Sequence, residues 1–274
     1  MGENIGSVAR AMSNFGLAEL RIVAPRDGWP NPKAVEMAAG GKEIIESAKI
    51  YENFEAAIAD IHITYATTAR PRDMIKRVVS PSEVVQEILS FSSKNPMPLT
   101  PAILSCNLLG GLEQQAMSEN LALDPRAGAG MTKTALVFGP ERTGLENEDI
   151  TLCNAIITIP TDEKNSSLNI AQSSVILGYE WMKGSLECRV WSVEEKQPHS
   201  KLQTQHSNPA LKQDFTEMFK QLEKYLDEAS YFRSPAKKKI MWQNIRNMLQ
   251  RTMWCEQEIR TFRGMLRALW EYGA

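Results

Sequence analysis

The chain has 274 residues, of which 43% are hydrophobic, and its formal net charge is −2. This composition is typical of a globular protein with a sizeable core. The sequence holds no run of about 18 apolar residues and does not open with a basic-then-apolar signal, so its residues indicate neither a membrane span nor export. We expect a cytoplasmic protein that does not act at a membrane.

Cysteines and histidines are too scattered to form a site. The four cysteines include no CxxC pair, which argues against a zinc ribbon and a disulfide framework. The three histidines are equally far apart, so no metal site and no Ser-His-Asp triad is expected.

The first part of the chain alternates between helical and strand patterns. Apolar residues recur at helical spacing from Ile5 to Phe15 and stop at Gly16, a residue suited to the position after a helix. A strand is predicted at 20–23, a helix from Asn31 to about Gly41, a short helix at 53–59 and a strand at 61–66. Ser80-Pro81-Ser82-Glu83 predicts a helix start with a capping box.

Two further strands are predicted at 134–138 and 155–159, and a long helix is predicted at about 168–182. Because strands alternate with helices, we expect an α/β fold in which a parallel sheet carries helices on both faces. This fold should occupy residues 1–190. Within it, prolines and glycines break the periodicity of residues 90–133, which predicts an insertion with much loop.

A polar stretch at 191–209 holds little that could be buried, which predicts a linker. Three amphipathic patterns then follow, so residues 210–274 should form a small all-helical domain. Residues 1–208 hold 19 Lys/Arg against 25 Asp/Glu, whereas 209–274 hold 12 against 8. The excess of basic residues in the second part indicates either an anionic partner such as RNA or a helical face that is simply exposed to solvent.

Three stretches share one build, in which a polar or glycine-bearing turn adjoins a helix. They run from Gly2 to Met12, from Leu136 to Leu145 and from Ile159 to Ser173. The middle stretch alone is a weak signal, and neither a Walker loop nor a GxGxxG fingerprint is present. Taken together and in this order, the three stretches resemble the three motifs of the SpoU family of the SPOUT RNA methyltransferases.

The resemblance implies a SPOUT-type fold in which the parallel sheet contains a trefoil knot, a rare exception to unknotted topology. It also implies S-adenosyl-L-methionine as the cofactor, RNA as the substrate and a homodimer in which two subunits complete each site. In that family an apolar strand leads into the first motif, and this sequence begins at Met1, just ahead of Asn4.

The family's cofactor loops correspond to positions after three strands of this chain. These positions would wrap the adenosine and methionine parts of the cofactor, since apolar walls with a few backbone donors suit adenine. The alternative is that the apolar members belong only to the core. The positions are Thr67, Thr68, Ala69, Gly139, Ile159, Pro160 and Leu168.

The resemblance also implies a set of catalytic residues: Arg10, Asn4, Glu141, Ser167 and Asn169. Because a guanidinium stays protonated, we expect Arg10 to stabilise the developing alkoxide of a ribose 2′-hydroxyl and to position a nearby phosphate. Glu141 and Asn169 would orient loops and the ribose. The alternatives are a surface arginine and, for Ser167, a helix cap.

One group within the family carries an Arg-x-Arg pair after a strand and a basic three-helix tail, and it methylates the pyrimidine at position 32 of the tRNA anticodon loop. This chain is similar in both respects. The resemblance therefore implies a set of RNA-binding residues: Arg70, Arg72, Lys237, Lys238, Lys239 and Arg246.

Two other functions stay open from the sequence. The first is the same chemistry on ribosomal RNA or on another tRNA site, because sequence motifs indicate the reaction more than they indicate which nucleotide is modified. The second is an RNA-binding module on the same scaffold that no longer catalyses. A nicotinamide-dependent enzyme is disfavoured by the absent glycine fingerprint.

Overall fold

The computed structural model describes residues 2–26, 28–70, 74–92, 101–106, 132–140, 143–194, 209–232 and 234–273. A parallel sheet of seven strands organises the first part, in the order β2-β1-β5-β6-β3-β7-β4. The strands are β1 (Leu20–Val23), β2 (Lys49–Tyr51), β3 (Ile63–Thr67), β4 (Val78–Val79), β5 (Ala102–Cys106), β6 (Thr134–Phe138) and β7 (Ala155–Ile157).

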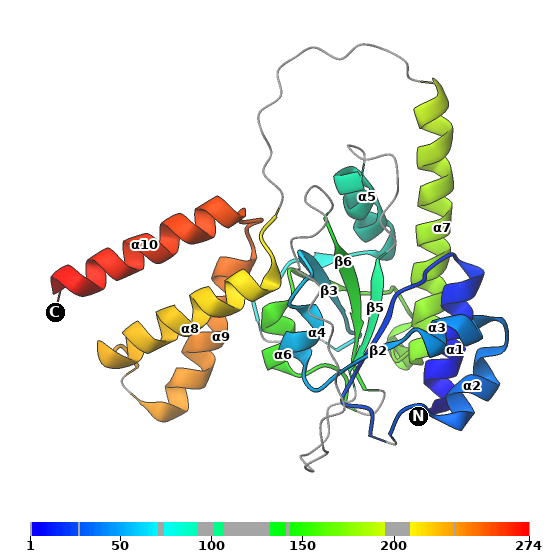
Figure 1. Ribbon diagram of the computed structural model, residues 1–274, viewed down its shortest axis with the longest axis horizontal. Helices are drawn as coiled ribbons and strands as arrows, with labels where there is room; N and C mark the ends of the chain where they lie inside the picture. Colours follow the sequence, from blue (N-terminus) through cyan, green and yellow to red (C-terminus); the bar gives the residue numbers. More distant parts are fainter. Residues whose placement is uncertain are drawn as a thin grey trace.

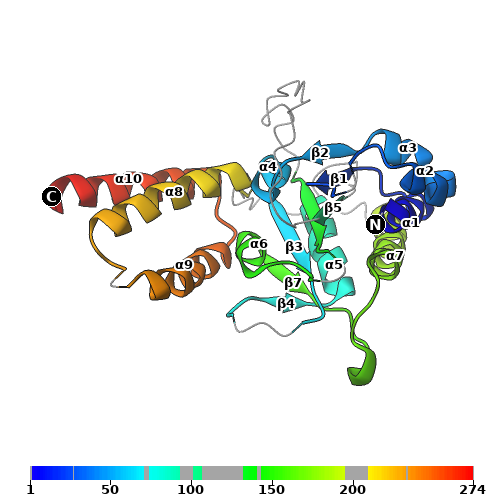
Figure 2. The ribbon, with the colours of Figure 1, turned by 90° about the horizontal axis from the view of Figure 1, so that it is seen from below.

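The sheet is covered on both faces because its inner strands alternate between two cores (Figure 2). In β6, for example, Leu136 and Phe138 belong to one core, whereas Ala135 and Val137 belong to the other. Successive side chains of a strand point to opposite faces, so a strand that is buried on both faces reads as continuously apolar.

One core lies under five helices: α1 (Gly2–Asn14), α2 (Pro32–Ala38), α3 (Lys42–Glu46), α5 (Pro81–Ser92) and α7 (Ile170–Glu194). A 3-10 turn at Ala39–Gly41 joins α2 to α3. Helix α1 lies against α2 at close range, since a Cβ on Gly6 would meet the carbonyl oxygen of Ala34. Helix α7 packs against α1 and α5.

The other core lies under two short helices, α4 (Phe54–Ile58) and α6 (Asn147–Leu152). The buried guanidinium of Arg21 ties β1 to this side. It donates hydrogen bonds to the carboxylates of Glu19 and Asp60 and to the carbonyl of Ala57. This network satisfies a charge that would otherwise be expensive to bury.

Three helices form the second part of the chain: α8 (Lys212–Glu228), α9 (Pro235–Gln250) and α10 (Glu256–Gly273). They have a core of their own, built around Phe215, Phe219 and Trp242. Figure 1 shows this tail on the side of the sheet that carries α4 and α6. Helix α8 contacts α4, and α9 contacts α6. No helix in the described ranges has the length and apolarity that crossing a membrane requires.

Several local predictions are confirmed. The capping box forms at the start of α5, where the backbone N–H of Ser80 donates to Glu83 and the N–H of Glu83 donates to the hydroxyl of Ser80. Gly16 follows α1 with a φ of 68°. The α/β fold with a helical second part is confirmed, and the knotted path stays a prediction.

The prediction of an insertion over residues 90–133 is wrong for residues 102–106. These residues form β5, an inner strand that pairs with β1 and β6. The strand is short, and its apolar and polar residues do not alternate, so the sequence carries no periodic signal that would predict it. The edge strands β2 and β4 were also not predicted. Helix α7 continues to Glu194, into the predicted linker, whereas 93–100, 107–131 and 195–208 lie outside the described residues.

The interface between the tail and the sheet buries an unusual residue, Lys212. Its backbone N–H donates to the carbonyl of Ile61, and its ammonium donates to Gln250 at 3.0 Å and lies 5.4 Å from the centre of the Phe215 ring. Burial, together with the charge of Lys76, lowers the pKa of Lys212 to about 7. In the unfolded chain this amine holds its proton up to its ordinary pKa of 10.5.

This difference predicts that stability rises with pH. Between pH 7 and 8.5 the unfolded state binds more protons at Lys212 than the folded state does, which adds about 1–2 kcal/mol to the free energy of unfolding. Lys212→Met should lose this increment when urea unfolding is measured at both pH values, and the exposed control Lys224→Met should keep it. The range ends at pH 8.5 because Cys153, whose folded pKa burial raises to about 11, titrates in the unfolded state near 9.0. Equal pH increments in Lys212→Met and the parent would contradict the prediction.

Candidate active site

Three neighbouring strands end at the same edge of the sheet. In the register of β6, β3 and β7, Thr67 stands beside Phe138 on one side and beside Ile157 on the other. The strands are parallel, so the segments that follow them leave the sheet together. The crevice beyond the carboxyl ends of parallel strands is where ligands bind in folds of this kind.

A pocket of about 300 Å³ opens at this edge. Residues after all three strands line it, together with the start of α7. They are Thr67, Thr68, Ala69, Arg70, Phe138, Gly139, Pro140, Gly144, Ile159, Ser166, Ser167, Leu168, Ile170 and Ser173. The volume lies at the lower end of the range for small-molecule sites.

The lining combines apolar walls with a few polar groups. Phe138, Ile159 and Leu168 supply apolar surface, and two threonines and three serines are also part of the lining. One of their hydroxyls, on Thr67, is buried and has no hydrogen-bond partner within the described residues. A buried polar atom without a partner is costly. A ligand that offers a hydrogen-bonding group at this position would therefore gain from it.

The turn after β6 is tightly wound. The N–H of Gly144, whose φ is 68°, donates to the carbonyl of Pro140 at 2.7 Å. A Cβ on Gly139 would run into the backbone of Gly144 and Leu145, so this position has room only for glycine. Arg70 closes the turn from the other side, since its guanidinium donates to the carbonyl of Thr143 at 2.9 Å.

The first and third motifs meet beside the pocket. The amide nitrogen of Asn169 donates to the side-chain oxygen of Asn4 at 3.4 Å. Asn169 also caps α7, because its side-chain oxygen accepts from the N–H of Ala171 and its own N–H donates to Gln172. The two residues on either side of Asn169, Leu168 and Ile170, line the pocket. Asn169 therefore holds the pocket wall in position through the start of the helix.

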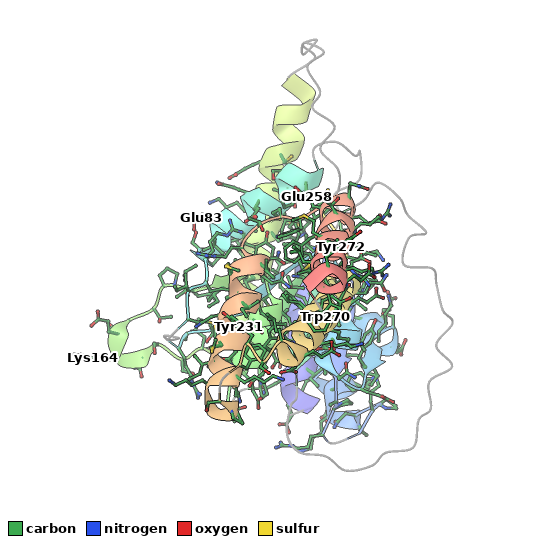
Figure 3. The ribbon with its side chains drawn as sticks, turned by 90° about the vertical axis from the view of Figure 1, so that its left-hand side faces the viewer. Glu83, Lys164, Tyr231, Glu258, Trp270 and Tyr272 are labelled. Atoms are coloured by element: carbon green, nitrogen blue, oxygen red, sulfur yellow. The ribbon has the colours of Figure 1, made fainter. Side chains whose placement is uncertain are left out.

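The polar turn between β7 and α7 projects away from the sheet, as the labelled Lys164 shows (Figure 3). It contains one turn of 3-10 helix at Glu163–Asn165, which Asp162 caps by accepting from the N–H of Lys164. Residues 161–167 are all exposed. Ser167, at the base of this turn, lines the pocket, and within the described residues the side chain that caps α7 is that of Asn169 and not that of Ser167.

Six of the seven residues predicted to bind a cofactor line this one pocket, namely Thr67, Thr68, Ala69, Gly139, Ile159 and Leu168. The seventh, Pro160, is exposed and is not part of the lining. Their role in binding stays a prediction, but the structure does bring them together from segments far apart in the sequence.

The predicted catalytic residues are only partly assembled. Ser167 lines the pocket, and Asn4 and Asn169 contact each other beside it. Arg10 is exposed on α1 and does not line the pocket of its own chain. Glu141 lies outside the described residues.

Most of the predicted RNA-binding residues have partners within the protein. Lys238 forms ion pairs with Glu223 and Asp227, and Lys239 forms one with Glu148 at 2.6 Å. The guanidinium of Arg246 lies over the Phe219 and Trp242 rings. Lys237 is exposed, Arg70 is part of the pocket wall, and Arg72 lies outside the described residues. Their contact with RNA stays a prediction.

Sequence reasoning did not single out six of the lining residues: Phe138, Pro140, Gly144, Ser166, Ile170 and Ser173. Phe138 and Pro140 adjoin Gly139, and Ser166 adjoins Ser167. These three could have been found from the sequence because each is next to a residue that was predicted to belong to the site. Ser173 lies three residues beyond Ile170, which puts both on one side of α7. Within the described ranges no cluster of His, Cys, Asp and Glu could hold a metal ion.

Comparison with known proteins gives consistent matches. The sequence model of the SpoU rRNA Methylase family matches residues 2–89 and 105–179. Among solved structures, TrmJ from Z. mobilis ZM4 is 32% identical with a TM-score of 0.72, and the match covers 98% of this chain and 94% of that one.

Curated relatives match at similar levels. The tRNA (cytidine/uridine-2′-O-)-methyltransferase TrmJ of Sodalis glossinidius (strain morsitans) is 26% identical over 266 residues, which are 97% of this chain and 86% of the relative. The tRNA (cytidine-2′-O-)-methyltransferase TrmJ of Methanocaldococcus jannaschii is 32% identical over 180 residues, which are 65% of this chain and 61% of the relative.

The crowded position of Gly139 generates a prediction. Gly139→Ala forces the backbone of Gly144 and Leu145 to move, so we expect the affinity for S-adenosylmethionine to fall by about tenfold or more. Isothermal calorimetry checks this. Gly264→Ala is the matched control, because a Cβ there meets nothing within 4 Å. Unchanged affinity in Gly139→Ala would contradict the placement of this turn in the cofactor site.

Proposed function

The chain belongs to the SpoU methylase family, and we propose that it is an S-adenosylmethionine-dependent methyltransferase that modifies a ribose 2′-hydroxyl of tRNA. The observation that carries the proposal is the pocket at the carboxyl ends of β6, β3 and β7, which is lined by the second and third motifs and joined to the first through Asn4 and Asn169. The tRNA substrate is supported by relatives that bear such names and match over both parts of this chain.

The lining residues fit the proposed cofactor. The segment from Thr67 to Ala69 and the turn at Gly139 offer backbone groups at strand ends, while Ile159 and Leu168 offer apolar walls for the adenosine. Thr67 also carries a buried hydroxyl without a partner in the described residues, and we expect cofactor binding to bring a polar group of the ligand to it. When bound, the cofactor supplies a methyl group on a sulfonium, which is a good leaving group.

The protein's task is then to prepare the acceptor. A ribose hydroxyl is a poor nucleophile, and a fixed positive charge beside it stabilises the alkoxide as it develops. Arg10 is our candidate for this role and for holding the adjacent phosphate. Because Arg10 is exposed on α1 and absent from the pocket of its own chain, we propose that two subunits pair so that Arg10 of one faces the pocket of the other.

The remaining predicted residues would position rather than transfer protons. Asn169 and Asn4 hold the start of α7 beside the pocket, and Ser167 offers a hydroxyl at its mouth. We propose that Glu141 orients the ribose from the turn after β6. Arg70 and Arg72 would contact phosphates near the site, and the basic tail would contact the body of the tRNA.

The proposed target is the pyrimidine at position 32 of the anticodon loop, and such an enzyme would act in the cytoplasm. Incubation of the full chain with total tRNA and methyl-labelled S-adenosylmethionine, followed by nuclease mapping, tests this. We expect label on the ribose of nucleotide 32. Label on ribosomal RNA or on another tRNA nucleotide would contradict nucleotide 32 as the target. If the chain does not bind the cofactor, the non-catalytic RNA-binding module would be favoured instead.

Arg10→Ala tests the proposed role of the guanidinium. The variant should bind S-adenosylmethionine as the parent does but transfer methyl groups about 10²–10³-fold more slowly, which is the usual loss when a group that stabilises an oxyanion is removed. Single-turnover assays measure the rate, and calorimetry measures cofactor binding. Lys42→Ala, which removes an exposed charge from α3, is the control. Methylation by Arg10→Ala at the parental rate would remove Arg10 from the mechanism.

A further inference from the structure

One buried ammonium group joins three segments of the chain. Lys76 follows β3 and precedes β4, and its side chain is 9% exposed. Its ammonium donates to the carbonyl of Thr151 on α6 at 3.3 Å and to the side-chain oxygen of Asn247 on α9 at 3.1 Å. None of the ion pairs found within the described ranges includes Lys76. The contact between the sheet and the tail is therefore centred on a charge that hydrogen bonds alone satisfy.

Both segments on the sheet side of this contact lead to the pocket. Lys76 comes shortly after the lining segment Thr67–Arg70 along the chain. Helix α6 begins at Asn147, just after the lining residue Gly144 and the buried Leu145. The turn before α6 has little freedom to absorb a shift, because Gly139 already lies against the backbone of Gly144 and Leu145. A movement of α6 would therefore reach the wall of the pocket.

The tail is seated on these segments by further contacts. On α9, Lys239 pairs with Glu148 of α6 at 2.6 Å, and the amide of Gln243 approaches the same carboxylate at 3.5 Å. At the start of α8, the N–H groups of Lys212 and Gln213 donate to the carbonyls of Ile61 and Ala59. Because the ammonium of Lys212 also donates to Gln250 at the end of α9, the two tail helices are held on the sheet as one unit.

Burying a lysine ammonium costs free energy of desolvation, which a contact that serves only for packing would avoid. Burial lowers the pKa of Lys76 to about 8. The amide nitrogens of Asn247 and Gln250 are buried with no hydrogen-bond partner within the described residues. Apolar side chains of similar volume would usually hold such an interface at least as well. What directed hydrogen bonds provide is a single relative position of the joined segments, as buried polar groups do in some other proteins.

We propose that Lys76 is a positioning residue that couples the seating of helix α9 to the shape of the cofactor pocket. The inference rests on the proposed function and adds that the tail regulates cofactor binding. The pocket takes its binding shape when α9 is seated on α6 and on the segment before β4. An RNA held by the tail can then favour or oppose cofactor binding through this contact, although the tail lies outside the pocket.

A double-mutant cycle on the full chain tests the coupling. Lys76→Met removes the charge at similar volume, and Asn247→Ala removes its partner on the tail. Each variant should bind S-adenosylhomocysteine about tenfold more weakly than the parent in calorimetry. The double variant should be no weaker than the worse single variant, because both changes break the same contact. Lys224→Met, an exposed lysine on α8, is the control and should bind as the parent does.

Stability is measured in parallel by thermal unfolding, and affinities are compared only where circular dichroism shows a folded chain. If Lys76→Met does not fold, Asn247→Ala and the milder Glu148→Gln, which weakens the pair with Lys239, carry the test. Variants that melt earlier but bind the ligand with the parental affinity would overturn the coupling. Losses that simply add in the double variant would overturn it as well. A parent chain that does not bind the ligand would instead refute the proposed function.

Discussion

The register of the parallel sheet is the constraint on which the site depends. Because β6, β3 and β7 are neighbours and run in the same direction, Phe138, Thr67 and Ile157 end side by side, and the segments that follow them share one space. These segments lie far apart in the sequence. A shift of one residue in the pairing would send the strand's core side chains to the opposite face of the sheet. The two apolar cores that fix the register therefore also fix the pocket.

The tail adds a second level of organisation. It has its own aromatic core around Phe219 and Trp242, yet it contacts the sheet through buried polar groups, among them Lys76 and Lys212. Several of its basic residues form contacts within the protein: Lys238 with α8, Lys239 with α6, and Arg246 with aromatic rings. The basic charge of the tail thus serves its internal packing and its docking as well as any contact with an anionic partner. This division of roles could not be seen from net charge.

The sequence predicted those features whose signal is local. The capping box at Ser80 and Glu83 and the three helices of the tail follow from spacing and residue type within a few positions. Strand β5 was taken for part of an insertion, because its five residues include one serine among apolar residues and show no alternation of apolar and polar positions. The buried positions of Arg21, Lys76 and Lys212 were not anticipated either, since their partners come from distant elements and a charged residue reads as exposed.

The same distinction applies to the site. Six predicted cofactor residues converge because they flank strand ends that the fold brings together. Arg10 lies on a part of α1 that this chain alone does not bring to the pocket, which is why we propose that a second subunit would bring it there. Motif matching finds which residues matter together, whereas the fold decides which of them meet within one chain.

A crystal structure of the full chain with S-adenosylhomocysteine would show whether this pocket holds the cofactor. We expect the ligand in the pocket between Thr67, Gly139 and Leu168, with a polar group of the ligand at the hydroxyl of Thr67. A ligand bound at any other place on the chain would contradict the assignment of this pocket as the cofactor site, and with it the chemistry derived from it.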